Sequence, residues 1–138
     1  MNDRPSAIEL IAAARMHLEK EVLPALAEPR LRFQTLVAAN VLLMVEREMT
    51  LAESQLEAEW ERLNALEGVS AALPLNLAAR REAIAARQGA LCERIRRGEF
   101  DEGEARHALF RHLRWTVEDK LRVANPRFLT RASGAKTE

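Results

Sequence analysis

The sequence predicts an all-α protein, and three observations indicate this class. The 138-residue chain is 48% hydrophobic and 30% charged, a balance typical of a folded domain and not of a disordered chain. Only five glycines and five prolines interrupt long stretches of Ala, Leu, Glu and Arg, which are strong helix formers. No run of alternating β-branched or aromatic residues occurs. We therefore expect a single-domain bundle of about five helices over residues 1–130 and a disordered tail over residues 131–138.

The first helix is expected to begin at Ser6 and to end near Leu23. Ser6 and Glu9 form an S-x-x-E capping box, which satisfies free N–H groups at the start of a helix. Apolar residues then recur at helical spacing as far as Val22. Pro24 disfavours the helical conformation of the residue before it, so the helix should stop there.

The second helix is expected over residues 29–51 and should be the central element of the bundle. Its segment 36–45, LVAANVLLMV, is apolar around most of its circumference. A helix of that composition is buried on all sides, so we expect the other helices to pack around it.

Three further helices are expected. The third spans residues 52–66 and stops at Gly68, and the fourth spans residues 77–97. The fifth should begin at a second capping box, Asp101 and Glu104, and end at Ala124 before Asn125 and Pro126. The third helix presents three apolar side chains on one face: Leu56, Trp60 and Leu63.

The charged residues are unevenly distributed although the net charge is zero. Residues 46–67 hold seven acids and two bases, whereas residues 80–97 hold six bases and two acids. Two interpretations stay open: acidic and basic helices that lie beside each other, or a bipolar surface that orients a partner. The zero net charge disfavours a nucleic-acid-binding protein.

The sequence predicts a cytoplasmic protein that does not cross a membrane. Its start, MNDRPSAIELIAA, lacks a basic leader followed by an uncharged run. No uncharged stretch reaches the roughly 20 residues that a bilayer span needs. The single cysteine, Cys92, excludes a disulfide framework.

No residue pattern indicates a catalytic site, a cofactor site or a metal site. His107 and His112 are five positions apart, a spacing that does not place two metal ligands on one helix face, and we expect the histidines to be exposed. Cys92 is interpreted as a small apolar residue, with a catalytic thiol as the alternative. We therefore predict that the chain is not itself an enzyme and has no cofactor or metal ion.

Three polar residues fall on otherwise apolar helix faces: Arg15, Asn40 and Lys120. A buried polar group destabilises a fold unless it finds hydrogen-bond partners. These residues are interpreted either as an internal polar network that fixes the helix register or as the lining of a ligand pocket. For Lys120, a third possibility is that the aliphatic stem packs while the amine reaches water.

The two tryptophans are expected to differ. Trp60 should belong to the core because it shares a face with apolar residues. Trp115 lies on a polar face near Arg111 and Arg122. Trp and Arg are enriched among the residues that dominate protein interfaces, so these three residues are candidate partner contacts. The alternative is that another part of the chain covers Trp115.

Several segments together resemble a family of short helical bacterial proteins. The resemblance covers residues 4–129. Its most specific pieces are R-P at 4–5, L-P at 23–24, V-A-A-N at 37–40, E-R-E at 46–48 and D-K-L-x-V-A-N-P at 119–126. Members of that family are typically encoded beside kinases that resemble aminoglycoside phosphotransferases and beside acyl-CoA-dehydrogenase-like enzymes.

The resemblance implies an accessory role. One member of the family is the small subunit of a kinase that phosphorylates 4-hydroxyacyl-CoA in levulinate catabolism. The chain is therefore expected to be a non-catalytic subunit that an aminoglycoside-phosphotransferase-like kinase needs for activity. A separate hypothesis, which depends on charge alone, is that Arg111, Arg114 and Arg122 receive the phosphates of acyl-CoA at the shared boundary. Two alternatives are a stand-alone acyl-CoA-binding module and a homo-oligomeric structural bundle.

Overall fold

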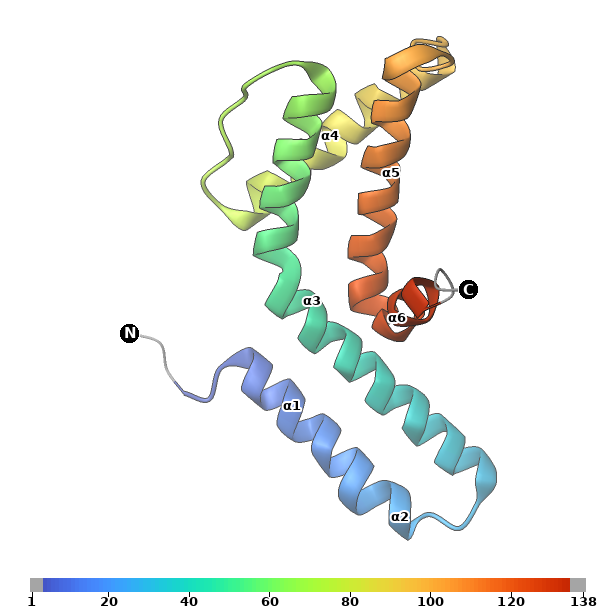
Figure 1. Ribbon diagram of the computed structural model, residues 1–138. Helices are drawn as coiled ribbons and strands as arrows, with labels where there is room; N and C mark the ends of the chain where they lie inside the picture. The colour runs from blue at the N-terminus through green and yellow to red at the C-terminus, as the bar shows by residue number, and fades with distance from the viewer. Residues whose placement is uncertain (1–3, 135–138) are drawn as a thin grey trace. The chain divides into compact units, whose positions relative to one another are not determined.

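The computed structural model describes residues 4–134, with side chains described as far as residue 130 (Figure 1). All regular secondary structure in these residues is helical, which confirms the all-α prediction. The chain divides into two compact units, Met1–Leu51 and Ala52–Glu138. The last helix, α6, spans Pro126–Gly134. It therefore includes the first part of the predicted tail 131–138, and the rest of that tail lies outside the described residues.

The first unit opens with helix α1, Ala7–His17, which begins as predicted. The Ser6 side chain accepts a hydrogen bond from the Glu9 N–H at 3.3 Å, and the Glu9 carboxylate accepts one from the Ser6 N–H at 2.7 Å. Both halves of the capping box are thus formed, and they satisfy N–H groups that have no partner within the helix.

The helical path continues beyond the predicted end near Leu23. It passes through a π-helical segment, Leu18–Val22, into the short helix α2, Leu23–Ala25. Pro24 lies in the first turn of α2, where the missing N–H of a proline costs little. Arg32 then caps the end of α2 by donating to two backbone carbonyls, at 2.9 and 3.0 Å.

Helix α3 is one continuous helix, Pro29–Glu67, of 39 residues. The prediction of two separate helices, over 29–51 and 52–66, is wrong because residues 30–67 contain neither glycine nor proline to interrupt the helix. Gly68 ends α3 as predicted, with a φ of +68° that few other residues adopt.

Within the first unit, α1 lies alongside the N-terminal part of α3 (Figure 1). An ion pair joins them, with Arg15 Nε lying 2.6 Å from Glu46 Oε1. Both side chains are largely shielded from water, with exposed fractions of 19% and 15%. This pair fixes the register of one helix against the other.

The segment 36–45 of α3 is not buried on all sides. Ala39 is buried, but three apolar residues of the same segment are about half exposed: Leu36, Val37 and Val41. Within this unit a single neighbouring helix lies along α3, and one helix covers only one side of another. The expectation of a fully enclosed central helix is therefore corrected.

In the second unit, residues 52–67 of α3 pack with helix α4, Leu77–Arg96, and helix α5, Gly103–Ala124 (Figure 1). The core is a cluster of buried side chains from these helices and from the turn between α4 and α5: Trp60, Leu63, Ile84, Leu91, Phe100 and Leu109. Leu63 is completely enclosed. Trp60 belongs to the core, as predicted.

Helix α5 does not begin at the predicted capping box. Its N-cap residue is Glu102, and no side chain caps the helix start. The first helical residue, Gly103, has a φ of +65°. This left-handed conformation separates Asp101 from the first turn, so its carboxylate does not reach the N–H groups there.

The acidic part of α3 lies beside the basic helix α4. Arg80 Nη1 is 3.0 Å from a carboxylate oxygen of Glu57, and Arg87 Nη2 is 2.8 Å from one of Glu67. The interpretation that acidic and basic helices are neighbours is confirmed for this pair. Acidic residues of α3 and basic residues of α4 therefore pair with each other inside the second unit.

Candidate functional site

A pocket of about 370 Å³ opens between α3 and α5 in the second unit. This volume lies in the range of ligand pockets, about 300–1,000 Å³. Helix α3 contributes a group of four lining residues: Glu61, Arg62, Ala65 and Leu66. Helix α5 contributes a second group: Ala108, Arg111, His112 and Trp115. In both groups the residues recur at intervals of three and four, which places them on one face of their helix.

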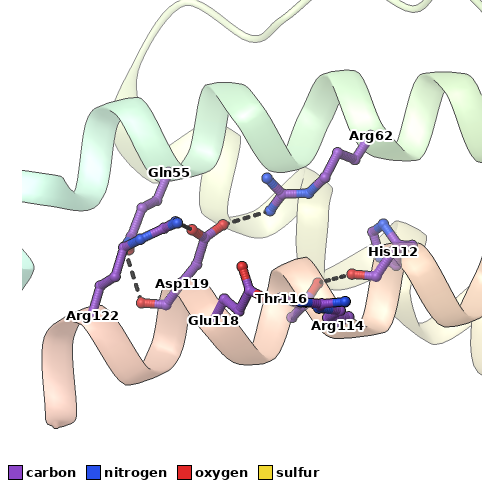
Figure 2. Close-up of polar contacts among 8 residues, drawn as sticks. All are labelled: Gln55, Arg62, His112, Arg114, Thr116, Glu118, Asp119 and Arg122. Carbon is purple, nitrogen blue, oxygen red and sulfur yellow. Dashed lines mark hydrogen bonds and ion pairs between the residues drawn. The ribbon is translucent and has the colours of Figure 1, made fainter. Parts of the chain in front are cut away.

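A cluster of hydrogen bonds joins the two walls beside the pocket (Figure 2). Arg62 Nη2 donates to Asp119 Oδ2 at 2.7 Å, and Arg122 donates to the other oxygen of the same carboxylate. Gln55 Nε2 donates to the backbone carbonyl of Asp119 at 3.0 Å. The Arg62 and Asp119 side chains are only 15% and 13% exposed, so water competes weakly for this pair. The cluster therefore holds the two walls at a fixed spacing.

His112 is buried in the α5 wall, with an exposed fraction of only 4%. Burial lowers the pKa of His112, and the negative charge of Glu59 opposes that shift. The imidazole is therefore neutral at neutral pH. Its Nδ1 is enclosed and has no hydrogen-bond partner among the described residues, and the same is true of Nε of Arg62 on the opposite wall.

Trp115 and Arg111 form the exposed part of the pocket lining. Trp115 is 48% exposed, and its ring centroid lies 5.9 Å from the guanidinium carbon of Arg62, which is a cation–π distance. Arg111 is exposed and forms no ion pair with another residue in the described part of the chain. An apolar group and an anionic group could therefore be held side by side here.

The predicted partner-contact residues come together on α5. Trp115 and Arg111 both line the pocket. Arg122 does not line it, but it is bound to Asp119 in the cluster beside it. The structure thus places two of these three residues at one concave surface.

The three polar residues of the apolar faces have different environments. Arg15 is partly buried and forms ion pairs with Glu46 and Glu19 in the first unit, so it lines no part of the pocket. Asn40 and Lys120 are exposed, which corrects the expectation that they are buried.

The reasons for these two corrections lie in the register and length of the helices. The stripe of α3 that contains Phe33, Val37 and Asn40 is its exposed side, because Phe33 is 66% exposed and Val37 is 47% exposed. Lys120 follows Leu109 by three turns on the same face of α5. It lies beyond the core cluster, which Leu109 joins.

Two pocket residues, Arg62 and His112, were missed by the sequence analysis. The prediction of exposed histidines is wrong for His112. Its spacing from Leu109 and Thr116, three and four residues, was a signal that it shares their face. Arg62 carried no comparable signal, because its partner Asp119 is 57 residues away in the chain.

His112 is expected to make stability depend on pH. In the unfolded chain a histidine has a pKa near 6.5. The folded pKa is lower, so the unfolded state binds more protons between the two values, and the free energy of unfolding falls as pH drops below about 6.5.

Denaturant unfolding at about pH 7.5 and about pH 5 tests this expectation. His112→Gln should lose less stability between the two pH values than the parent chain. His107→Gln is the comparison variant, because it makes the same change at an exposed histidine of the same helix. A pH dependence that is the same in His112→Gln and in the parent would contradict the assignment.

Two further kinds of functional element are absent from residues 4–134. No helix there combines the length and the apolar character that crossing a bilayer requires. The same residues contain no cluster of three or more histidine, cysteine or acidic side chains with the geometry of a metal site.

Comparison with known proteins gives one match. A family model described as a domain of unknown function, DUF6285, matches residues 24–128. No curated protein and no solved structure matches the chain significantly. The matched range covers more than half of the chain and includes both walls of the pocket. The chain therefore belongs to the DUF6285 family.

Proposed function

We propose that this chain is a non-catalytic accessory subunit of a cytoplasmic kinase. The proposed partner is an aminoglycoside-phosphotransferase-like kinase that phosphorylates 4-hydroxyacyl-CoA in the catabolism of short-chain acids such as levulinate. The sequence resemblance supports the choice of partner. One observation supports a docking role: Trp115 is half exposed in the lining of a pocket that also includes Arg111, which forms no ion pair with another described residue.

The chemistry of this surface suits a protein interface. Trp and Arg residues near the centre of an interface account for much of the binding free energy. Here Trp115 and Arg111 lie on α5, and the Arg62–Asp119 pair fixes α5 against α3. A helix whose backbone is held in place before binding loses less conformational entropy when the partner docks. Trp115 and Arg111 are therefore the residues that we assign to the kinase contact.

Activation then follows from differential binding. A subunit that binds the active conformation of the kinase more tightly than the inactive one shifts the population toward the active form. It needs no catalytic group of its own for this effect. Among the three arginines Arg111, Arg114 and Arg122, we assign Arg111 to binding an acyl-CoA phosphate at the shared boundary. The other two each donate a hydrogen bond to a neighbouring carboxylate.

Substitution of Trp115 by alanine tests the docking role. We expect Trp115→Ala to weaken binding to the kinase at least tenfold, a typical loss for an interface tryptophan. The melting temperature should change little because the side chain lies outside the core cluster. The measurement is titration calorimetry with the kinase encoded beside this chain, together with a thermal melt of the variant.

Phe110→Ala is the matched control for this test. Phe110 is also an exposed aromatic residue of α5, at 58%, but it does not line the pocket. Its replacement should leave kinase binding unchanged. Unchanged binding by Trp115→Ala, or equal losses in the two variants, would contradict the assigned surface. Micromolar binding of acyl-CoA to the isolated chain would instead support the stand-alone acyl-CoA-binding module.

A further inference from the structure

The two walls of the pocket each carry a buried polar atom without a partner. On α3 this atom is Nε of Arg62, and on α5 it is Nδ1 of His112. Native structures keep few such atoms, because each has given up its hydrogen bond to water without replacing it. The Nε of an arginine is always a donor, and a neutral histidine can place its proton on Nδ1. Both atoms can therefore donate to an oxygen acceptor.

The charges at the pocket favour an anionic acceptor. The positive charge of Arg62 is balanced by Asp119, whereas Arg111 has no ion pair with a described residue. Glu61 also lines the pocket, and since it and Arg111 are both exposed, water screens both charges. Arg111 is thus the cation available to a ligand, and an arginine pairs strongly with a carboxylate.

The rest of the lining is apolar. Its remaining members are Ala65, Leu66, Ala108 and Trp115. The volume of about 370 Å³ exceeds what a single water or inorganic ion fills. A ligand that fits this lining has an apolar body as well as its charged group.

We propose that this pocket binds a small organic carboxylate. Its apolar body packs against Leu66 and Trp115, and its two oxygens accept hydrogen bonds from Arg62 and His112, with Arg111 nearby. Both donor atoms are shielded from water in the structure. Entry of the ligand therefore requires a side-chain rotation, and the half-exposed Trp115, whose ring lies over Arg62, is the residue that moves.

The test is titration of the isolated full-length chain with 4-phenylbutanoate and with 4-phenylbutanamide, which has the same shape and no charge. We expect the carboxylate to bind at least tenfold more tightly than the amide, because its hydrogen bonds are charge-assisted. Nuclear magnetic resonance should show a shift of the Trp115 indole N–H, which Trp115→Phe identifies. Equal affinities for the two compounds, or no saturable binding of the carboxylate at about 1 mM, would overturn the proposal.

Two arginine variants distinguish binding of the carboxylate in the pocket from nonspecific electrostatic attraction of the carboxylate to the basic residues of α5. Arg111→Gln should weaken carboxylate binding about fivefold or more by removing the cation beside the ligand. Arg114→Gln is the matched control, because Arg114 is on the same helix but outside the pocket, where it pairs with Glu118 at 2.9 Å. Equal effects of the two variants would overturn the assignment. The kinase is absent from this titration, so its outcome is independent of the proposed docking role.

Discussion

Replacing Leu63 with alanine should lower the free energy of unfolding by about 3 kcal/mol, within the range of measured Leu→Ala losses in protein cores. Leu63 is completely enclosed, and it lies in the cluster that α3, α4 and α5 form together. The substitution removes buried methyl groups and leaves a cavity that three helices around it cannot easily close. Denaturant unfolding followed by circular dichroism measures the loss.

The matched control is Leu75→Ala. Leu75 lies in the connection between α3 and α4, and it is 95% exposed, so the same change of side chain removes almost no buried surface. Its effect should stay within about 0.5 kcal/mol. Similar losses in the two variants would show that Leu63 is not the centre of the core.

Replacing Asp119 with alanine should cost about 2–3 kcal/mol, because a charged hydrogen-bonding partner is lost from a shielded pair. The Arg62 side chain, which is 15% exposed in the parent, would lose its carboxylate partner, and its Nε has no partner among the described residues. Arg122 would lose its contact as well. Since this pair links α3 to α5, we also expect the shape of the pocket to change, which a shift of the Trp115 indole N–H resonance should report.

The neighbouring residue provides the control for Asp119. Glu118→Ala removes a carboxylate that pairs with Arg114, whose side chain is 70% exposed, and such surface pairs contribute about 1 kcal/mol or less. The double variant Arg62→Met, Asp119→Leu should regain part of the lost stability, because it leaves no unpaired charge. A small effect of Asp119→Ala, equal to that of Glu118→Ala, would contradict the role given to this pair.

Local features of the fold could be predicted from the sequence. The capping box at Ser6 and the stop at Gly68 depend on residues that are close in the chain, and both formed as predicted. The burial of Trp60 in the core could be predicted because it recurs at helical spacing with apolar residues on one face. The break expected at residue 51 did not occur, since the change from apolar to acidic side chains alters burial and not backbone conformation.

The pocket could be predicted only in part. Trp115 and Arg111 were identified because both lie on one helix and their residue types are typical of interfaces. Arg62 and His112 were not, because their roles depend on which face of α3 meets α5. That choice is made by the packing of the whole cluster around Leu63, which no single helical segment contains.

The central claim is that this chain activates a kinase by docking through Trp115 and Arg111. The most direct measurement is the rate of 4-hydroxyacyl-CoA phosphorylation by the proposed partner kinase, purified alone and after addition of this chain. We predict little activity alone, full activity with the parent chain, and a higher concentration requirement with Trp115→Ala. A kinase that is equally active with and without this chain would contradict the account.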